Sequence, residues 1–535
     1  MSETNGRHVE VYDTTLRDGA QGAGVSFSPS GALRFAAALD EFGVDYVEGA
    51  LVAGNGDGEA FYKELNSLEW RNAKLAAFGR TRRPGGTAAG DAGLQGLLRT
   101  EAPVVSLVGK GSRAQVERVL RADAAENLAM IAESVAFLRD RGREVVFDAE
   151  HFFDGWTADA EYALSALGAA LAAGAGRVVL CDTNGGRMPW EVAAGVRAVR
   201  ERFPEALVGV HLHNDSDVAV AATLAAVRAG AGLVQGTFNG YGERIGNADL
   251  CSVLPNLALK MGVEMECGSH LVDLRGVSRL LDELLDRRPD EGRPYVGANA
   301  FTHKAGMHVD AVTKDPGSFE HVDPAAVGNR RRVLVSGLSG EDNVRLKTEE
   351  LGAELGKGDA EVHEILRQLK VMESDGYQFE SADGSFRLLV ERAMNRRRTF
   401  FELLGFSVMV QKQGAGAPTT TVATIKVAVG GKAELAAGEG EGPVDALNCA
   451  LRRGLRRFYP AIDEVVLEDY HVRILNPEVA TQATTRVLIE SSDGVHRWGT
   501  VGVSANIIEA SWQALADSVE YKLLLEERKN AENRG

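Results

Sequence analysis

RVVLCDTNGGRMPWEVAAGVRAVRERFPEALVGVHLHND, residues 177–215, is the stretch that decides the fold. It contains two β-branched apolar runs, RVVLCDT (177–183) and LVGVHLHN (207–214), with an alanine-rich segment of helical pattern between them. A strand followed by a helix and a second strand predicts parallel pairing, because the helix returns the chain to the same edge of the sheet. The stretch therefore predicts one repeating unit of an α/β fold.

The same alternation runs through the first half of the chain. Further strand candidates, each followed by a helical pattern, are 8–13, 45–50, 74–79, 104–109, 144–151 and 233–240. About eight such units in roughly 260 residues favour a closed (β/α)8 TIM barrel, with a doubly wound open sheet as the alternative. Polar residues at or near the strand ends favour the barrel, because its strand C-termini meet at one mouth. These residues are Asp13, Glu48, Asp148, Glu150, Asp182, His213 and Asn239.

The pattern changes twice after the barrel. We predict a catalytic (β/α)8 barrel over residues 1–262, a mostly helical linker subdomain over 263–395 and a C-terminal α+β domain over 396–535. Residues 422–525 contain two segments that each read as strand, glycine turn, strand and helix. This resemblance between the segments is either an internal repeat of a small α+β unit or a chance match.

Composition limits the class of protein. The 535 residues include 59 Lys and Arg against 76 Asp and Glu, so the formal net charge is −17, which argues against a general nucleic-acid surface. No apolar stretch approaches the roughly 20 residues of a membrane span, and the first residues lack a signal pattern, so we expect a cytoplasmic protein with no membrane partner. The cysteines are scattered and are expected to be reduced. They are Cys181, Cys251, Cys267 and Cys449.

His211 and His213 stand two apart at the end of a strand, so their side chains point to the same face. Alone, such a pair is more often a polar cluster than a pair of metal ligands. The loop 11–21, VYDTTLRDGAQ, strengthens the case for a metal, because it brings carboxylates to the same mouth. A carboxylate, two imidazoles and open positions describe a catalytic divalent-metal site. The loop presents Asp13, Arg17, Asp18 and Gln21.

Other candidates have two interpretations each. Arg17 is either half of a surface ion pair or a fixed guanidinium that stabilises negative charge on an oxygen. Glu150 is either a general base for a proton next to a carbonyl or a partner for Arg17. The glycines of 239–250, NGYGERIGNADL, do not have the dinucleotide-binding spacing, and they suit either an anionic ligand or a tight turn. His308, in FTHKAGMHVDAV (301–312), is by itself more typical of a structural histidine.

Several motifs in a fixed order make the chain resemble a known family. They are DTTLRDGAQ, DAEHFFDG, CDTNGG, HLHNDS, GTFNGYGERIGN, FTHKAGMHVDAV and VGNRRRVLVSGLSG. Together they resemble the isopropylmalate and homocitrate synthase family, and within it the long bacterial citramalate synthases. The resemblance extends over nearly the whole chain, through GTVGVSANIIEASWQAL.

The resemblance implies an activity and roles for individual residues. The activity is a metal-dependent, Claisen-type condensation of acetyl-CoA with a 2-oxo acid, pyruvate in citramalate synthases, followed by hydrolysis of the thioester. By this resemblance Asp18, His211 and His213 match ligands of a divalent metal (Mn, Mg or Zn), and Asn247 matches a further or water-mediated ligand. Arg17 matches the residue that stabilises the enolate oxygen, Glu150 the base, Thr183 a residue that hydrogen-bonds the oxo acid, and His308 a residue contributed by the linker subdomain.

The resemblance also implies partners. The C-terminal domain is similar to a regulatory domain that binds a branched-chain amino acid end product, and the family precedent implies a homodimer. Gln21, in the loop that carries Asp18, is a further candidate for binding the substrate.

The chain departs from the family pattern at three places. Segments 50–57 and 111–115 lack the bulky residues usual after strands two and four, and Asp217 stands where a glycine is expected. The first two departures suggest a larger or more polar 2-oxo acid than pyruvate. Two other classes of protein are a same-fold acyl-CoA lyase or aldolase, which would not need the region after residue 395, and a non-catalytic amino-acid sensor.

Overall fold

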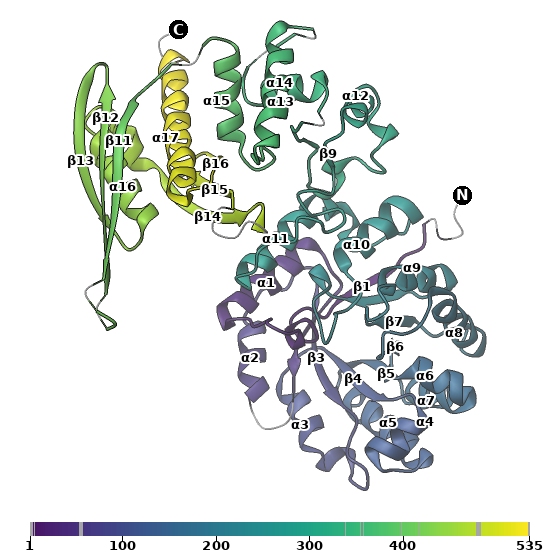
Figure 1. The fold of residues 1–535 in the computed structure, drawn as a ribbon. Helices are drawn as coiled ribbons and strands as arrows, with labels where there is room; N and C mark the ends of the chain where they lie inside the picture. The colour runs from purple at the N-terminus through teal and green to yellow at the C-terminus, as the bar shows by residue number, and fades with distance from the viewer. Residues whose placement is uncertain are drawn as a thin grey trace. The chain divides into compact units, whose positions relative to one another are not determined.

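The fold is that of a computed structural model of the chain (Figure 1). It describes residues 4–532 except 5, 53–56, 338, 354, 357, 397, 413, 417 and 478–482. The chain divides into two compact units. The first comprises Met1–Phe301 and Val322–Arg330, and the second comprises Thr302–His321 and Arg331–Gly535.

Eight parallel strands form a closed barrel in the order of the sequence, with β1 hydrogen-bonded to both β2 and β8. The strands are β1 (Glu10–Asp13), β2 (Tyr46–Leu51), β3 (Lys74–Arg80), β4 (Val104–Lys110), β5 (Glu144–Glu150), β6 (Arg177–Asp182), β7 (Val208–Leu212) and β8 (Leu233–Gly236). The predicted (β/α)8 barrel is thereby confirmed, with strand ends that differ from prediction by four residues at most. The open-sheet alternative is wrong, because an open sheet would leave β1 and β8 unpaired.

Helices of the first unit surround this barrel (Figure 1). They are α1 (Pro29–Phe42), α2 (Asp57–Leu65), α3 (Ala92–Arg99), α4 (Arg113–Gln115), α5 (Ala124–Arg139), α6 (Phe152–Ala158), α7 (Ala160–Ala172), α8 (Pro189–Arg202), α9 (Ala219–Ala229), α10 (Leu250–Pro255) and α11 (Leu274–Leu284). Side-chain caps fix several helix starts; Ser28 accepts from the Gly31 N–H, and Asp123 accepts from the Glu126 N–H. Strand residues that face outward share one apolar core with the helices, and a second cluster, which includes Tyr12, Tyr46 and Val146, fills the barrel interior. The strands are therefore buried on both faces.

The two ends of the barrel carry different groups of polar residues. At the N-terminal end, Arg177 forms ion pairs with Glu10 and Glu144, and Lys74 also pairs with Glu144 at 2.8 Å. These pairs join the beginnings of four strands. The C-terminal end instead presents the polar residues predicted for the site, as is usual for enzymes of this fold.

The second unit begins with short strands and helices. These are β9 (Thr302–His303), α12 (Gly306–Lys314), β10 (Arg332–Val333), α13 (Glu341–Glu350), α14 (Ala360–Ser374) and α15 (Asp383–Ala393). Val344, Ile365 and Phe386, one from each of the last three helices, are buried in a common core. The predicted mostly helical character of this region is confirmed.

Two α+β repeats complete the second unit (Figure 1). Each has a three-stranded antiparallel sheet followed by a helix. They are β11 (Glu402–Lys412), β12 (Thr419–Val429), β13 (Lys432–Gly440) and α16 (Pro443–Leu455), then β14 (Val466–Ile474), β15 (Thr485–Ser492), β16 (Arg497–Ser504) and α17 (Ile507–Glu532). The sequence predicted the last two strands and the helix of each repeat but missed β11 and β14. Both repeats contribute to one apolar core, for example through Leu447 and Leu515.

Two expectations from composition concern the whole chain. All four cysteines are free thiols, and three of them are buried, in agreement with the expectation that they form no disulfide. Among the described residues, no helix combines the length and the apolar character needed to cross a membrane.

Candidate active site

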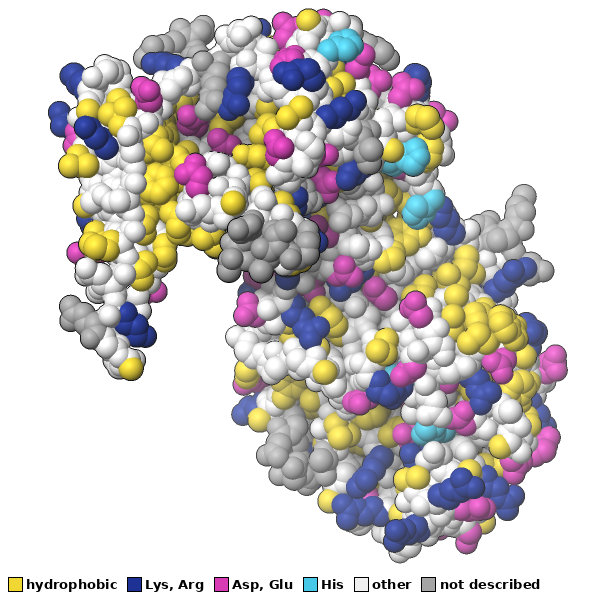
Figure 2. Space-filling model, viewed as in Figure 1, with side chains coloured by type: hydrophobic (Ala, Val, Ile, Leu, Met, Phe, Trp, Pro, Cys, Tyr) yellow, Lys and Arg dark blue, Asp and Glu magenta, His cyan; other side chains and the backbone are white. Residues whose placement is uncertain are grey.

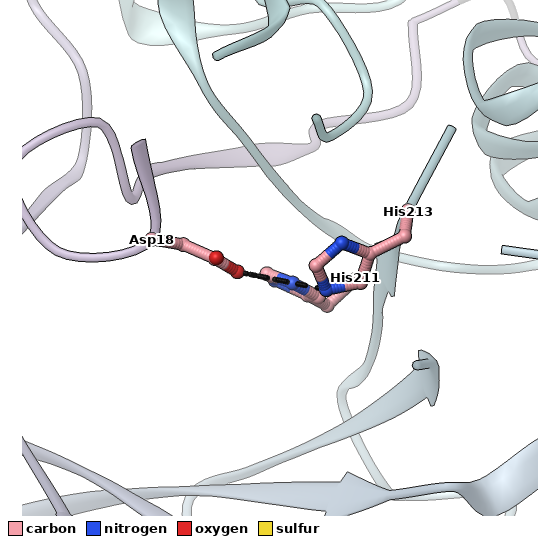
Figure 3. Close-up of side chains that lie close together, drawn as sticks. All are labelled: Asp18, His211 and His213. Carbon is pink, nitrogen blue, oxygen red and sulfur yellow. Dashed lines mark ion pairs between the residues drawn. The ribbon is translucent and has the colours of Figure 1, made fainter. Parts of the chain in front are cut away.

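Asp18, His211 and His213 lie together at the C-terminal mouth of the barrel (Figure 3). An Asp18 carboxylate oxygen, Oδ2, lies 3.1 Å from His211 Nε2 and 3.7 Å from His213 Nε2. Each residue offers one ligand atom, and these atoms are within 4.8 Å of one another. All three side chains are at most 8% exposed. The structure therefore brings together the carboxylate and the two imidazoles that the sequence placed on two strand ends.

A tight turn after β1 positions Asp18. The carbonyl oxygen of Thr14 accepts hydrogen bonds from the N–H groups of Arg17, Asp18 and Gly19. Asp13, the other carboxylate of the motif, is not part of the cluster. It accepts hydrogen bonds from the N–H and the hydroxyl of Thr15, at 2.9 and 2.7 Å, and so braces the turn.

A second loop positions Asn247. The segment 239–250 folds back so that Asn247 pairs with His213 in an isolated bridge. A Cβ atom on Gly246 would lie 1.9 Å from the carbonyl oxygen of Gly240, and its φ is +113°, so the turn requires glycine there. The glycines of this loop thus make the tight turn, which was one of the two interpretations from sequence.

The donor atoms at this mouth fit a divalent cation. His213 Nδ1 and both side-chain polar atoms of Asn247 are buried and have no hydrogen-bond partner within the described part of the chain. A buried polar atom without a partner is costly, so these atoms call for a ligand or water. Two imidazole nitrogens, a carboxylate oxygen and an amide oxygen are donors that Zn²⁺ and Mn²⁺ accept.

Electrostatics sets the protonation of the cluster. Burial alone would raise the pKa of Asp18, but the Arg17 guanidinium, 3.3 Å away, and His211 outweigh it and hold that pKa far below its usual range. Burial, together with the neighbouring His211, lowers the pKa of His213 to about 4. At neutral pH Asp18 is therefore ionised and His213 is neutral, which are the forms that bind metals.

Arg17 is held in place on several sides. Its Nε donates to Glu48 Oε2 at 2.5 Å, and its guanidinium lies 4.0 Å from the centre of the Phe78 ring. Glu48 is fully buried and also accepts a hydrogen bond from the Tyr12 hydroxyl at 3.1 Å. Burial raises the pKa of Glu48 despite the Arg17 charge. Arg17 is thus a fixed guanidinium rather than half of a surface pair.

Glu150 ends β5 and forms an ion pair with Lys110, at the end of β4. It is 30% exposed, whereas Lys110 is 15% exposed. Both residues line a cavity of about 250 Å³, which is also lined by Arg80, Val108 and Met130. The charged partner of Glu150 is therefore Lys110, while that of Arg17 is Glu48.

The other predicted site residues each have contacts of their own. Thr183 follows β6, and its hydroxyl oxygen accepts the His151 N–H at 2.9 Å, which joins the ends of β5 and β6. Gln21 is exposed on the turn after Asp18. His308 is exposed on α12 of the second unit, where its ring stacks on Phe319 at 4.2 Å. The roles of these three residues stay predictions.

The departures from the family pattern have local explanations where they are described. Residues 53–56 of the first segment lie outside the described residues. In the second, a Cβ on Gly111 would lie 3.2 Å from the Cα of Phe152 and 3.3 Å from a backbone oxygen, so neighbouring chain fills that room. Asp217 has a φ of +56°, the conformation that favours glycine, and its carboxylate accepts from the Asn214 side chain at 3.3 Å.

Sequence reasoning missed three residues around this mouth. Glu48 was noted only as a polar strand end, and neither Lys110 nor Gln235 was singled out. Gln235 is buried on β8 and contacts His211. The available signal was a polar residue inside an apolar run, LVQG, on a strand that must be buried on both faces.

A closed parallel barrel with a carboxylate and two imidazoles at its C-terminal mouth belongs to a class of metal-dependent barrel enzymes. The family model described as HMGL-like matches residues 8–281, and this family is metal-dependent. Homocitrate synthase post-HMGL domain-like matches residues 295–376, and the LeuA allosteric (dimerisation) domain matches residues 380–523.

Individual relatives extend the similarity to nearly the full chain. The (R)-citramalate synthase of Aquifex aeolicus is 45% identical over 519 residues, which cover 97% of this chain and 98% of the relative. That of Geobacter sulfurreducens is 47% identical over 515 residues, covering 96% and 97%. That of Synechocystis is 44% identical over 527 residues, covering 96% of each. The chain belongs to the citramalate synthase family, which confirms the resemblance noted in the sequence.

Proposed function

We propose that the protein condenses acetyl-CoA with pyruvate and releases citramalate and CoA. The observation that carries this proposal is the buried cluster of Asp18, His211 and His213 with the fixed guanidinium of Arg17 beside it. Similarity to (R)-citramalate synthases along almost the whole chain supports pyruvate as the oxo acid. The same similarity leaves a bulkier 2-oxo acid as the alternative with less support.

The cluster would make the keto carbon of the oxo acid a better electrophile. Asp18, His211 and His213, with Asn247, would hold a divalent cation, whose chemistry when bound is to polarise the keto group of the oxo acid. Mn²⁺, Mg²⁺ and Zn²⁺ are all candidates. Thr183 and Gln21 would orient the oxo acid by hydrogen bonds.

The remaining residues act on acetyl-CoA. Glu150 removes a proton from the acetyl methyl group, and its ion pair with Lys110 holds the carboxylate in position. Arg17 stabilises the enolate oxygen that develops. The methylene carbon then bonds to the keto carbon of pyruvate, the resulting alkoxide takes a proton, and water hydrolyses the thioester to release CoA. His308 would assist from the linker subdomain.

We further propose a homodimer regulated through its C-terminal domain. Both three-stranded sheets carry exposed apolar side chains, and Figure 2 shows hydrophobic side chains gathered in this part of the chain. The exposed apolar residues of the two sheets are Leu404, Met409, Val410, Leu435, Val466, Val472 and Ile474. The match to a LeuA allosteric (dimerisation) domain supports both the second copy and an amino-acid effector. A cytoplasmic location is part of the same proposal.

A thiol-release assay tests the activity. Acetyl-CoA and Mn²⁺, Mg²⁺ or Zn²⁺ are supplied with pyruvate, 2-oxobutanoate, 2-oxoisovalerate or no oxo acid, and free CoA is followed. We expect release only with an oxo acid, with the highest kcat/KM for pyruvate and none above background for an Asp18→Asn variant. Highest activity with a bulkier acid would overturn pyruvate as substrate. No release with any acid would leave the sensor and lyase interpretations, because a lyase cleaves a carbon–carbon bond of a larger acyl-CoA and frees no thiol.

A further inference from the structure

A buried row of hydrogen bonds lies behind His211. Its Nδ1 lies 2.9 Å from Gln235 Oε1, on β8. Gln235 Nε2 donates to Asp148 Oδ1, on β5, at 3.1 Å. The Ser106 hydroxyl, on β4, donates to Asp148 Oδ2 at 2.9 Å. All four residues are at most 5% exposed, so water does not compete for these groups.

The hydrogen bonds give the row a direction. Both oxygens of Asp148 accept, one from the Gln235 amide NH₂ and one from the Ser106 hydroxyl, and the Gln235 amide oxygen is left facing His211. An amide oxygen also only accepts, so Nδ1 of His211 must carry a proton. This holds whether the imidazole is neutral or cationic. The lone pair of the neutral ring is then on Nε2, the atom that faces Asp18.

The two histidines of the cluster differ in this respect. His213 Nδ1 has no hydrogen-bond partner within the described part of the chain, whereas His211 Nδ1 is tied to a side chain anchored on two further strands. The ring orientation of His211 is therefore set by the barrel itself. Groups that hold the second nitrogen of a ligating histidine commonly change metal affinity by 10–100-fold when removed.

We propose that Gln235 is a positioning residue. Because Asp148 holds its amide NH₂, its amide oxygen faces Nδ1 of His211 and fixes the tautomer that binds a divalent metal through Nε2. This inference rests on the proposed function only for the identity of the metal site. A purely structural role, in which Gln235 satisfies polar groups in the barrel, would require the same burial but no particular orientation of its amide.

The test exchanges the two groups of the row. Gln235→Met, which keeps the length but not the hydrogen bonds, is expected to weaken binding of Mn²⁺ alone by about 10–100-fold in calorimetric titration. Asp148→Asn is also expected to weaken Mn²⁺ binding. The NH₂ group of the introduced asparagine can donate to Gln235, whose amide would then rotate and face His211 with its own NH₂ group. The double variant Gln235→Glu with Asp148→Asn restores an acceptor facing His211 and a donor facing the introduced carboxylate. We expect it to bind Mn²⁺ within about threefold of the unaltered chain.

The matched control is Thr223→Val. Thr223 is buried on α9, and its hydroxyl donates to the Ala219 carbonyl of the same helix at 2.8 Å, so this variant should keep the Mn²⁺ affinity. Nitrogen-15 NMR of the metal-free protein, labelled at histidine and recorded at alkaline pH, where the imidazole rings are neutral, provides a readout independent of binding and of activity. We expect a protonated Nδ1 on His211 in the unaltered chain and in the double variant, and a mixture of tautomers in Gln235→Met.

The outcomes are distinct. Unchanged affinity and an unchanged Nδ1 proton in Gln235→Met would overturn the inference, and so would a double variant no better than Asp148→Asn alone. Loss of folding in Gln235→Met leaves the double variant to decide. If the unaltered chain binds neither Mn²⁺ nor Zn²⁺, the proposed metal site fails, and the NMR tautomer of His211 still decides the role of Gln235.

Discussion

Replacing Asp13 by asparagine is expected to stabilise the barrel at neutral pH, although Asp13 braces the turn that carries Asp18. Asp13 is fully buried, and burial raises its pKa from 3.8 to about 7 despite two hydrogen bonds from Thr15. Between these two values the folded state binds more protons than the unfolded chain. Stability therefore falls as pH rises from about 4 to about 7, and the charged form is the less favourable one.

The magnitude follows from the pKa. A rise from 3.8 to about 7 corresponds to about 4 kcal/mol above pH 7, since one pKa unit is worth about 1.4 kcal/mol. Asparagine keeps an acceptor for the Thr15 N–H but replaces the carboxylate bonded to the Thr15 hydroxyl, a loss of about 1 kcal/mol. The net gain at pH 8 is about 3 kcal/mol, or roughly 6 °C in the midpoint of the barrel's unfolding. Near pH 4.5 the gain should vanish.

Differential scanning calorimetry of the barrel transition between pH 4.5 and 8 measures this difference. Asp154→Asn is the control of opposite sign, because hydrogen bonds from Arg187 and His151 lower the pKa of Asp154 despite its partial burial. That variant should lose stability at pH 8. An Asp13→Asn protein that is less stable at pH 8, or that differs from the unaltered chain by the same amount at both pH values, would refute the reasoning.

Three further variants test other parts of the structure. Arg17→Lys should lower kcat by about 10²–10³-fold, because lysine lacks the planar group that can contact Glu48 and the enolate oxygen together. A loss of kcat below about threefold in steady-state assays would contradict this. Lys110→Met should lower kcat/KM, because Glu150 loses the ion pair that holds its carboxylate in place; an unchanged kcat/KM would exclude the pair from catalysis. Lys522→Met should destabilise the second unit by about 3 kcal/mol in calorimetry, because Asp493 would remain buried without its cation; an unchanged transition would show that Lys522 is not needed.

The strands of the barrel could be predicted because each is buried on both faces and is bounded by turn residues. Runs such as RVVLCD and VVSLVGK are short, nearly continuous apolar stretches, which are typical of strands buried on both faces. The helices between them require the strands to be parallel. β11 and β14 were missed for the opposite reason. They are largely exposed strands, ELLGFSVMVQK and VLEDYHVRI, in which charged and polar residues interrupt the apolar pattern. Their pairing with β12 and β15 is a long-range effect that a local pattern does not contain.

The cluster of Asp18, His211 and His213 could be predicted for a similar reason: each residue lies near the end of a strand or in the loop that follows one, and the fold brings those ends together. The partners of Arg17 and Glu150 could not. Which carboxylate pairs with Arg17 depends on side-chain direction near the mouth. Glu48 lies within β2 and pairs with Arg17, whereas Glu150 ends β5 and pairs with Lys110. Gln235 was hidden because its role depends on a neighbour across the barrel rather than along the chain.

The two carboxylates of DTTLRD show how one short motif separates two tasks. Asp13 and Asp18 are both buried, but only Asp18 lies against a guanidinium and two imidazoles. Its charge is therefore stabilised before any cation arrives, whereas burial raises the pKa of Asp13 and its hydrogen bonds go to its own turn. If Asp18 had the surroundings of Asp13, its pKa would be raised and its carboxylate would be protonated more often, which would make it a poorer metal ligand. The turn at Thr14 thus determines which of two identical side chains can be a ligand.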